Sequence, residues 1–112
     1  MKRKFLLYQT EEHGFAFWGL DFLKRVLGET PTTETPKLEY VLKYENELDL
    51  PSDDMVALAE LYELCNLHHP VDYKTRSMSV SDIVVLDGKE YFVDSFGFEL
   101  VKDRRVEGLT NE

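Results

Sequence analysis

The residue types most capable of chemistry lie together between residues 65 and 72. A thiol, two imidazoles and a carboxylate occur in this short span: Cys65, His68, His69 and Asp72. All four are zinc-ligand types, and the imidazoles and carboxylate also suit a nuclease that cleaves RNA by acid–base chemistry. A Cys-x-x-His unit without a second pair is a weak zinc signal, and a cysteine nucleophile needs an electropositive setting, whereas this neighbourhood is acidic. We therefore predict no metal, no cofactor and no catalytic residue, with the nuclease as an alternative.

A second group, Ser77, Ser79 and Ser81, alternates directly before Asp82. Nothing around these serines resembles the strand-turn-helix motif of a serine nucleophile. Serine and aspartate before a strand more often bond nearby backbone amides. We therefore predict a structural turn in which Asp82 fixes the entry of the next strand.

The N-terminal half contains the first elements that must position these groups. Residues 4–10 suit an opening strand, and apolar spacings of three and four predict a helix over the second half of residues 15–27, ended by Gly28. Residues 29–36 read as an exposed loop. Residues 37–44 alternate as a half-buried strand, and its apolar members should share one side: Leu38, Tyr40, Leu42 and Tyr44.

A second helix should follow Ser52 as its cap and run to Leu64 or Asn66, before Pro70. Its buried stripe is predicted to contain Cys65 with four larger residues: Met55, Leu58, Leu61 and Tyr62. The outer side should carry a residue at every third position: Asp54, Ala57, Glu60 and Glu63.

The clearest local signal is Asp87-Gly88 between two apolar runs, which predicts a β-hairpin of residues 81–86 and 90–93. Residues 98–102 suit a further edge strand, and the last residues, to Glu112, should fray. Of Phe96 and Phe98, at least one should join the core, and an aromatic patch for a partner is the alternative. The predicted fold class is α+β, with two helices packed on a mostly antiparallel sheet of four to five strands, as a single domain over residues 1–112.

Charge is the strongest compositional feature. Twenty-two acidic residues against thirteen basic ones leave a net charge of −9, which disfavours direct DNA binding. No lysine or arginine occurs between Glu45 and Glu63. The seven acidic residues of that stretch are the predicted partner-binding residues: Glu45, Glu47, Asp49, Asp53, Asp54, Glu60 and Glu63. A negative surface favours a basic partner, and general solubility is the alternative reason for the charge.

The composition also bears on location. No apolar stretch approaches the ~20 residues that span a bilayer, and Met1 to Thr10 contains no signal-peptide core. The single cysteine cannot form an internal disulfide and fits a reducing compartment. These features predict a cytoplasmic protein.

The segment from Asn66 to Phe98 resembles the YodL-like domain of Gram-positive mobile elements. The resemblance rests on the run 77–86, on Tyr91 to Phe98 and on four single residues: Asn66, Pro70, Asp72 and Tyr73. Thr75 stands where the family is expected to have glycine, and Cys65 where it is expected to have an aromatic residue. The family implies no catalytic residues. Small acidic proteins in this setting are also similar in size and charge to type II-A anti-CRISPR proteins.

The resemblance and the acidic stretch together predict an anti-defence protein that is not an enzyme. In this hypothesis its carboxylates bind Cas9, or the complex of Cas9 with guide RNA, and block the basic groove that engages nucleic acid. The alternative is a regulator that binds a host cytoskeletal or cell-division protein.

Overall fold

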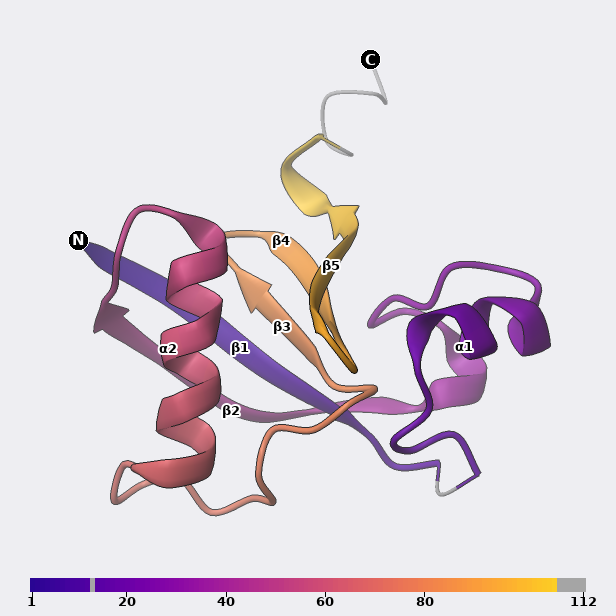
Figure 1. Ribbon diagram of the computed structural model, residues 1–112, viewed down its shortest axis with the longest axis horizontal. Coiled ribbons are helices and arrows are strands. Elements are labelled where there is room, and N and C mark those ends of the chain that lie inside the picture. Colours follow the sequence, from indigo (N-terminus) through magenta and orange to yellow (C-terminus); the bar gives the residue numbers. More distant parts are fainter. Residues whose placement is uncertain (13, 107–112) are drawn as a thin grey trace.

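Five antiparallel strands form the sheet at the centre of the computed structural model, which describes residues 1–12 and 14–106 (Figure 1). The spatial order is β2-β1-β3-β4-β5. The elements follow the chain as β1 (Lys2–Thr10), α1 (Leu20–Leu27), a short 3₁₀ turn (Pro36–Leu38), β2 (Tyr40–Asp49), α2 (Asp54–Leu67), β3 (Ile83–Leu86), β4 (Lys89–Asp94) and β5 (Gly97–Asp103). The predicted α+β class and element order are confirmed, and β5 is an edge strand as expected.

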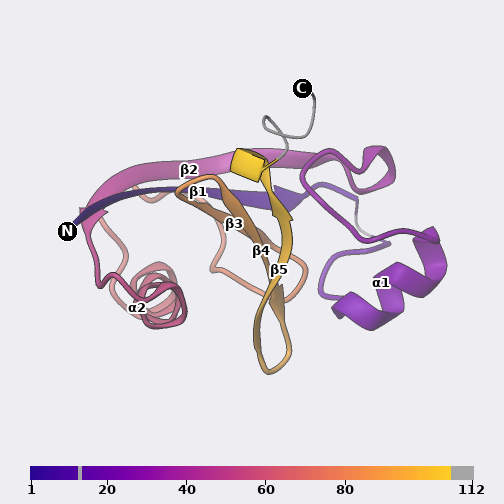
Figure 2. The same ribbon diagram turned by 90° about the horizontal axis from the view of Figure 1, so that it is seen from above.

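The two helices cover opposite faces of the sheet (Figure 2). Alternate residues of a strand point to opposite faces, and on β3 Val84 packs with α2 whereas Val85 packs with α1. This two-sided burial explains why β3 is apolar at every position instead of alternating.

The hairpin of β3 and β4 forms at Asp87-Gly88, as the sequence predicts. Asp87 (φ 50°) and Gly88 (φ 84°) both adopt left-handed backbone conformations, which is the geometry of a type I′ turn. A two-residue turn of this type sets the register, so Leu86 pairs with Lys89 and Ile83 pairs with Phe92.

The first helix begins at Leu20, which confirms the prediction of a helix over the second half of residues 15–27. Phe17 has a left-handed φ of 73°, which no α-helix accommodates. The predicted end is confirmed, since Gly28 (φ 75°) donates its amide hydrogen to the carbonyl oxygen of Lys24.

The predicted shared side of β2 is wrong for Tyr44, because Leu38 and Tyr40 pack on the α1 side of the sheet and Tyr44 packs on the α2 side. The strand begins at Tyr40, after Leu38 is buried in the 3₁₀ turn. A bulge at Lys43 then reverses the alternation, since Leu7 pairs with Tyr44 but Tyr8 pairs with Leu42. Leu42 therefore lies on the α1 side of the sheet and Tyr44 on the α2 side.

The second helix is rotated relative to the predicted orientation, and its cap is Asp53 instead of Ser52. Met55 and Tyr62 are 48% and 43% exposed, whereas Ala57, expected on the outer side, is fully buried. The buried side consists of Ala57, Leu58, Leu61 and Cys65. The physical reason is Asp54, whose carboxylate is held at the sheet by polar partners described below and thereby sets the inner face of the first turn.

Candidate functional site

The seven predicted partner-binding carboxylates do not form one surface. On β2, Tyr44 and Leu48 pack with α2, so Glu45, Glu47 and Asp49 alternate with them and face the opposite side of the sheet. Asp53, Glu60 and Glu63 belong to α2, on the other side.

Two of the three carboxylates of β2 lie opposite basic residues of β1, whereas Glu45 lies opposite Leu6. Asp49 lies opposite Lys2 and accepts a hydrogen bond of 2.5 Å from the N-terminal amine of Met1. That hydrogen bond and the charge of the amine lower the pKa of Asp49. Glu47 lies opposite Lys4 in the same register. Cross-strand pairs of opposite charge reduce the negative field on this side of the sheet.

Asp54 is part of an internal polar network. Arg3, only 5% exposed, donates to Asp54 Oδ1 at 2.5 Å, and Lys89 and Tyr91 contact Asp54 Oδ2. Burial alone would raise the pKa of Asp54, but hydrogen bonds from Lys89, Tyr91 and Arg3 outweigh it and hold the pKa well below its ordinary value. These contacts fasten the first turn of α2 to β1 and β4.

The outer side of α2 carries the remaining three carboxylates. Asp53, Glu60 and Glu63 are exposed, and among the described residues none of them forms an ion pair. Asp53 also accepts a hydrogen bond from the amide of Val56 at the helix start. Since α2 contains no lysine or arginine, all of the charged residues on its outer side are acidic.

An apolar groove lies beside this helix, between α2 and the β4–β5 hairpin. It consists of two adjoining hollows of about 370 and 530 Å³ that share Ala59, Asp94, Gly97 and Phe98. Met55 and Tyr62 of α2 line one side, and Phe96, fully exposed, lies at the hairpin turn. The expectation that one of the two phenylalanines joins the core holds for Phe98, whose ring contacts that of Tyr62 at 6.4 Å between centroids.

The Cys65–Asp72 cluster is dispersed in the structure. Cys65 is fully buried on the inner side of α2, and burial raises the pKa of its thiol to about 11. The thiol is therefore not activated as a nucleophile. His68 and His69 are exposed, and Asp72 accepts a hydrogen bond of 2.9 Å from the Tyr44 hydroxyl. No group of three or more His, Cys, Asp and Glu residues suited to a metal ion occurs in the part of the chain that the structure describes.

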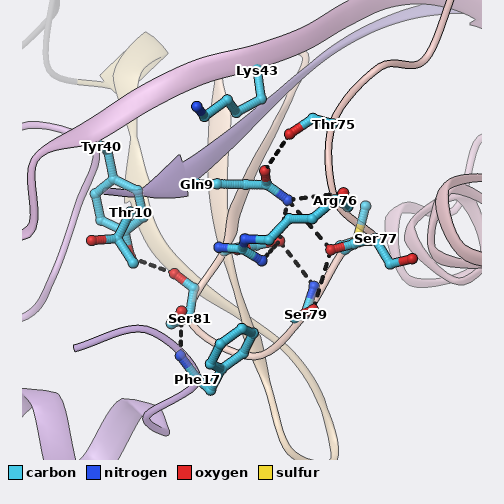
Figure 3. A network of polar contacts seen from close by, with 12 residues as sticks. Gln9, Thr10, Phe17, Tyr40, Lys43, Thr75, Arg76, Ser77, Ser79 and Ser81 are labelled. Carbon is cyan, nitrogen blue, oxygen red and sulfur yellow. Dashed lines mark hydrogen bonds and ion pairs between the residues drawn. The ribbon is translucent and has the colours of Figure 1, made fainter. Parts of the chain in front are cut away.

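A buried polar network joins β1 to the segment before β3 (Figure 3). Asp82 has no exposed surface and accepts hydrogen bonds from Arg76 at 3.0 Å, from Gln9 at 3.1 Å and from the Ser79 amide at 2.9 Å. Burial raises the pKa of Asp82 to about 6, against the opposing effects of those donors. Thr75 donates to Gln9 Oε1, so the amide of Gln9 is also satisfied.

The serines of this segment have structural roles. Ser79 Oγ donates to the carbonyl oxygen of Ser77, and Ser81 Oγ accepts from the Phe17 amide at 3.0 Å. Ser81 itself has a left-handed φ of 86°. The predicted structural turn with Asp82 at the strand entry is thus confirmed, and what the sequence did not reveal was its attachment to Gln9 and Phe17.

An open hollow of about 500 Å³ adjoins this network, with Lys43, Lys74 and Arg76 in its wall. Arg76 is committed to Asp82 and its guanidinium lies 5.1 Å from the ring centroid of Phe17, while Lys43 pairs with Glu11. Internal partners thus offset two of these three cations.

Residues that carry the family resemblance hold the same segment in place. Asn66 donates to the carbonyl oxygen of Met78, and Tyr73 donates its hydroxyl hydrogen to the carbonyl oxygen of Arg76. Thr75, in the place expected for glycine, supplies the hydrogen bond to Gln9. These positions therefore act as scaffold and not as a reactive centre.

The fold and its surfaces define a small α+β domain with buried polar networks and two distinct outer surfaces on the α2 side. The family model of the YodL-like domain matches residues 3–103, and the chain belongs to this family. The match extends through the N-terminal half, well beyond the residues 66–98 that carried the resemblance. No curated protein and no solved structure matches the chain significantly. No helix in the described ranges is long and apolar enough to cross a membrane.

Proposed function

We propose that this protein acts by binding, without catalysis, and that its target is a basic protein surface contacted by the outer side of α2. The observation that carries the proposal is a set of exposed carboxylates on α2 that form no ion pair with any residue the structure describes: Asp53, Glu60 and Glu63. Unpaired charges of one sign attract an oppositely charged partner and accelerate its association.

The proposed contact surface contains only three of the seven acidic residues that the sequence predicted. Glu45, Glu47 and Asp49 lie on the opposite side of the sheet beside Lys2 and Lys4, so one flat partner surface cannot engage both groups. Asp54 is occupied by Arg3, Lys89 and Tyr91.

For the partner, we propose a host protein whose basic groove holds nucleic acid, with Cas9 as the first to test. YodL-like domains occur in mobile elements, where small proteins act against host defence. Cas9 holds its guide–target duplex in a positively charged channel, which a compact negative helix surface would obstruct.

The test compares two variants that remove the same charge from opposite sides of the sheet. The first is Asp53→Asn, Glu60→Gln and Glu63→Gln, in which asparagine retains the helix cap. The matched control is Glu45→Gln, Glu47→Gln and Asp49→Asn. Binding to purified Cas9 with guide RNA should weaken about tenfold for the first variant and less than about twofold for the control, and should weaken further as salt rises.

Equal losses in the two variants, or no binding to Cas9 by the wild-type protein, would contradict this assignment. Expression in a host that lacks CRISPR provides the second comparison. A defect in cell shape or division there would direct the search to a cytoskeletal partner instead.

A further inference from the structure

The apolar groove between α2 and the β4–β5 hairpin combines exposed large side chains with an acidic border. Phe96 is fully exposed, and Met55 and Tyr62 retain 48% and 43% of their surface. Contiguous apolar surface of this kind in a protein rich in charge commonly marks a binding site. The turn of the β4–β5 hairpin projects from the sheet between the two helices in Figure 2.

The α2 wall of the groove has helical spacing. Met55, Ala59 and Tyr62 recur at intervals of four and three, which places them in one stripe along two turns. Ala59 lies in the middle, where its small side chain leaves the space shared by the two hollows. On the other wall, Phe98 packs edge-on against Tyr62, and Gly97 has open space where a side chain would begin.

The charge at the border of the groove determines which kind of partner it can bind. Asp94 and Glu99 line the hollows, and Glu63 follows Tyr62 on the solvent side of the helix, while no lysine or arginine is among the lining residues. Two copies of this chain meeting through the groove would bring carboxylates together, which disfavours self-association. A basic segment with apolar side chains at helical spacing complements both the floor and the border.

We propose that this groove binds a lysine- or arginine-rich amphipathic helix of the partner, whose apolar face packs between Tyr62 and Phe96. In helix-in-groove recognition the bound helix inserts anchors at i, i+3 or i+4, and i+7. The α2 stripe has the same spacing, so the two helices can pack side by side. The basic character of this partner rests on the proposed function. The apolar binding site is the new part, because attraction between charges does not require one.

The experiment uses the full chain and a labelled 18-residue peptide with leucine at helical spacing and lysine elsewhere. A scrambled peptide of the same composition measures attraction by charge alone. Ala59→Trp fills the shared space, and Val71→Trp adds the same ring at a residue that is 93% exposed elsewhere. Phe96→Ala removes a groove ring, and Phe17→Ala removes an exposed ring on another part of the surface.

The ordered peptide should bind at least about tenfold more tightly than the scrambled one. Ala59→Trp and Phe96→Ala should each weaken this binding severalfold, while Val71→Trp and Phe17→Ala leave it within about twofold. Equal binding of both peptides, or unchanged binding by Ala59→Trp and Phe96→Ala, would overturn the groove assignment. A wild-type dimer that Ala59→Trp dissociates, measured by sedimentation, would overturn it in favour of self-association.

The charge and groove variants distinguish an error in the groove assignment from an error in the proposed function. If the α2 charge variant loses binding to Cas9 while Ala59→Trp and Phe96→Ala retain it, the acidic surface stands and the groove assignment falls. If the charge variant retains binding to Cas9, the proposed function itself falls.

Discussion

Asp54, Asp82 and Glu90 are carboxylates held by internal partners. Within residues 1–12 and 14–106, by contrast, Asp53, Glu60 and Glu63 form no ion pair and project from the outer side of α2. Asp53 and Asp54 are adjacent in the chain, yet only Asp54 reaches the sheet. Carboxylates with internal partners orient the helices and strands of the fold. The exposed carboxylates of α2 instead create a negative field that can attract a partner.

Removal of an internal carboxylate should have the largest effect on stability. In Asp82→Ala, Gln9 and the Ser79 amide lose a buried acceptor and Arg76 loses its ion-pair partner. We expect the free energy of unfolding to decrease by about 3 kcal/mol in chemical denaturation at pH 7. A decrease in the free energy of unfolding below about 1 kcal/mol would show that the Asp82 network does not stabilise the fold.

The pH dependence of Asp82 follows from its raised pKa. An unfolded aspartate titrates near 3.9, so between about pH 4 and 6 the native protein retains a proton that the unfolded chain has released. The part of the stability that depends on this proton is complete below about pH 4 and is lost as the pH rises through about 6. Asp82→Asn cannot titrate, so the stability of the wild type relative to this variant should fall over that window, on the order of 2 kcal/mol. A constant difference from pH 4 to 7 would contradict the buried titration.

Asp54 should respond to pH in the opposite direction. Its lowered pKa means that its contribution is present above about pH 4 and is lost as the pH falls toward the folded value. Asp54→Asn should therefore cost about 1–2 kcal/mol at pH 7 and progressively less below pH 4. Denaturation profiles at pH 7, 4 and 3 measure this convergence, and a gap that widens in acid would refute it.

The outer carboxylates should have the smallest effect. Neutralisation of Asp53, Glu60 and Glu63 to amides leaves no buried group unpaired, so the free energy of unfolding should change by less than about 0.5 kcal/mol. Thermal and chemical denaturation check this value. A larger loss would place these residues with the internal set and weaken the proposal that they serve a partner.

Local chemistry made several features predictable from the sequence. Asp87-Gly88 specifies a type I′ turn because both residues accept left-handed φ values, and Gly28 ends α1 for the same reason. The element order and the scaffold role of the serines and Asp82 were likewise predictable. Burial of Cys65 followed from its place on an apolar stripe.

Long-range contacts explain what was mispredicted. The periodicity of α2 allowed Met55 or Asp54 to face inward, and the choice depends on Arg3, Lys89 and Tyr91 from other strands. The bulge at Lys43 depends on the pairing of β2 with β1, and it places Tyr44 on the α2 side of the sheet.

By itself, the sequence determined the composition of this protein, its hairpin, its helix end and its acidic stretch, because these depend on residue type and near neighbours. Only the tertiary structure decided that the acidic stretch is divided between two sides of the sheet. It also decided that Met55, Ala59 and Tyr62 face the β4–β5 hairpin across an open groove. Both outcomes depend on strand pairing and on the rotation of α2, which arise from residues distant in the chain.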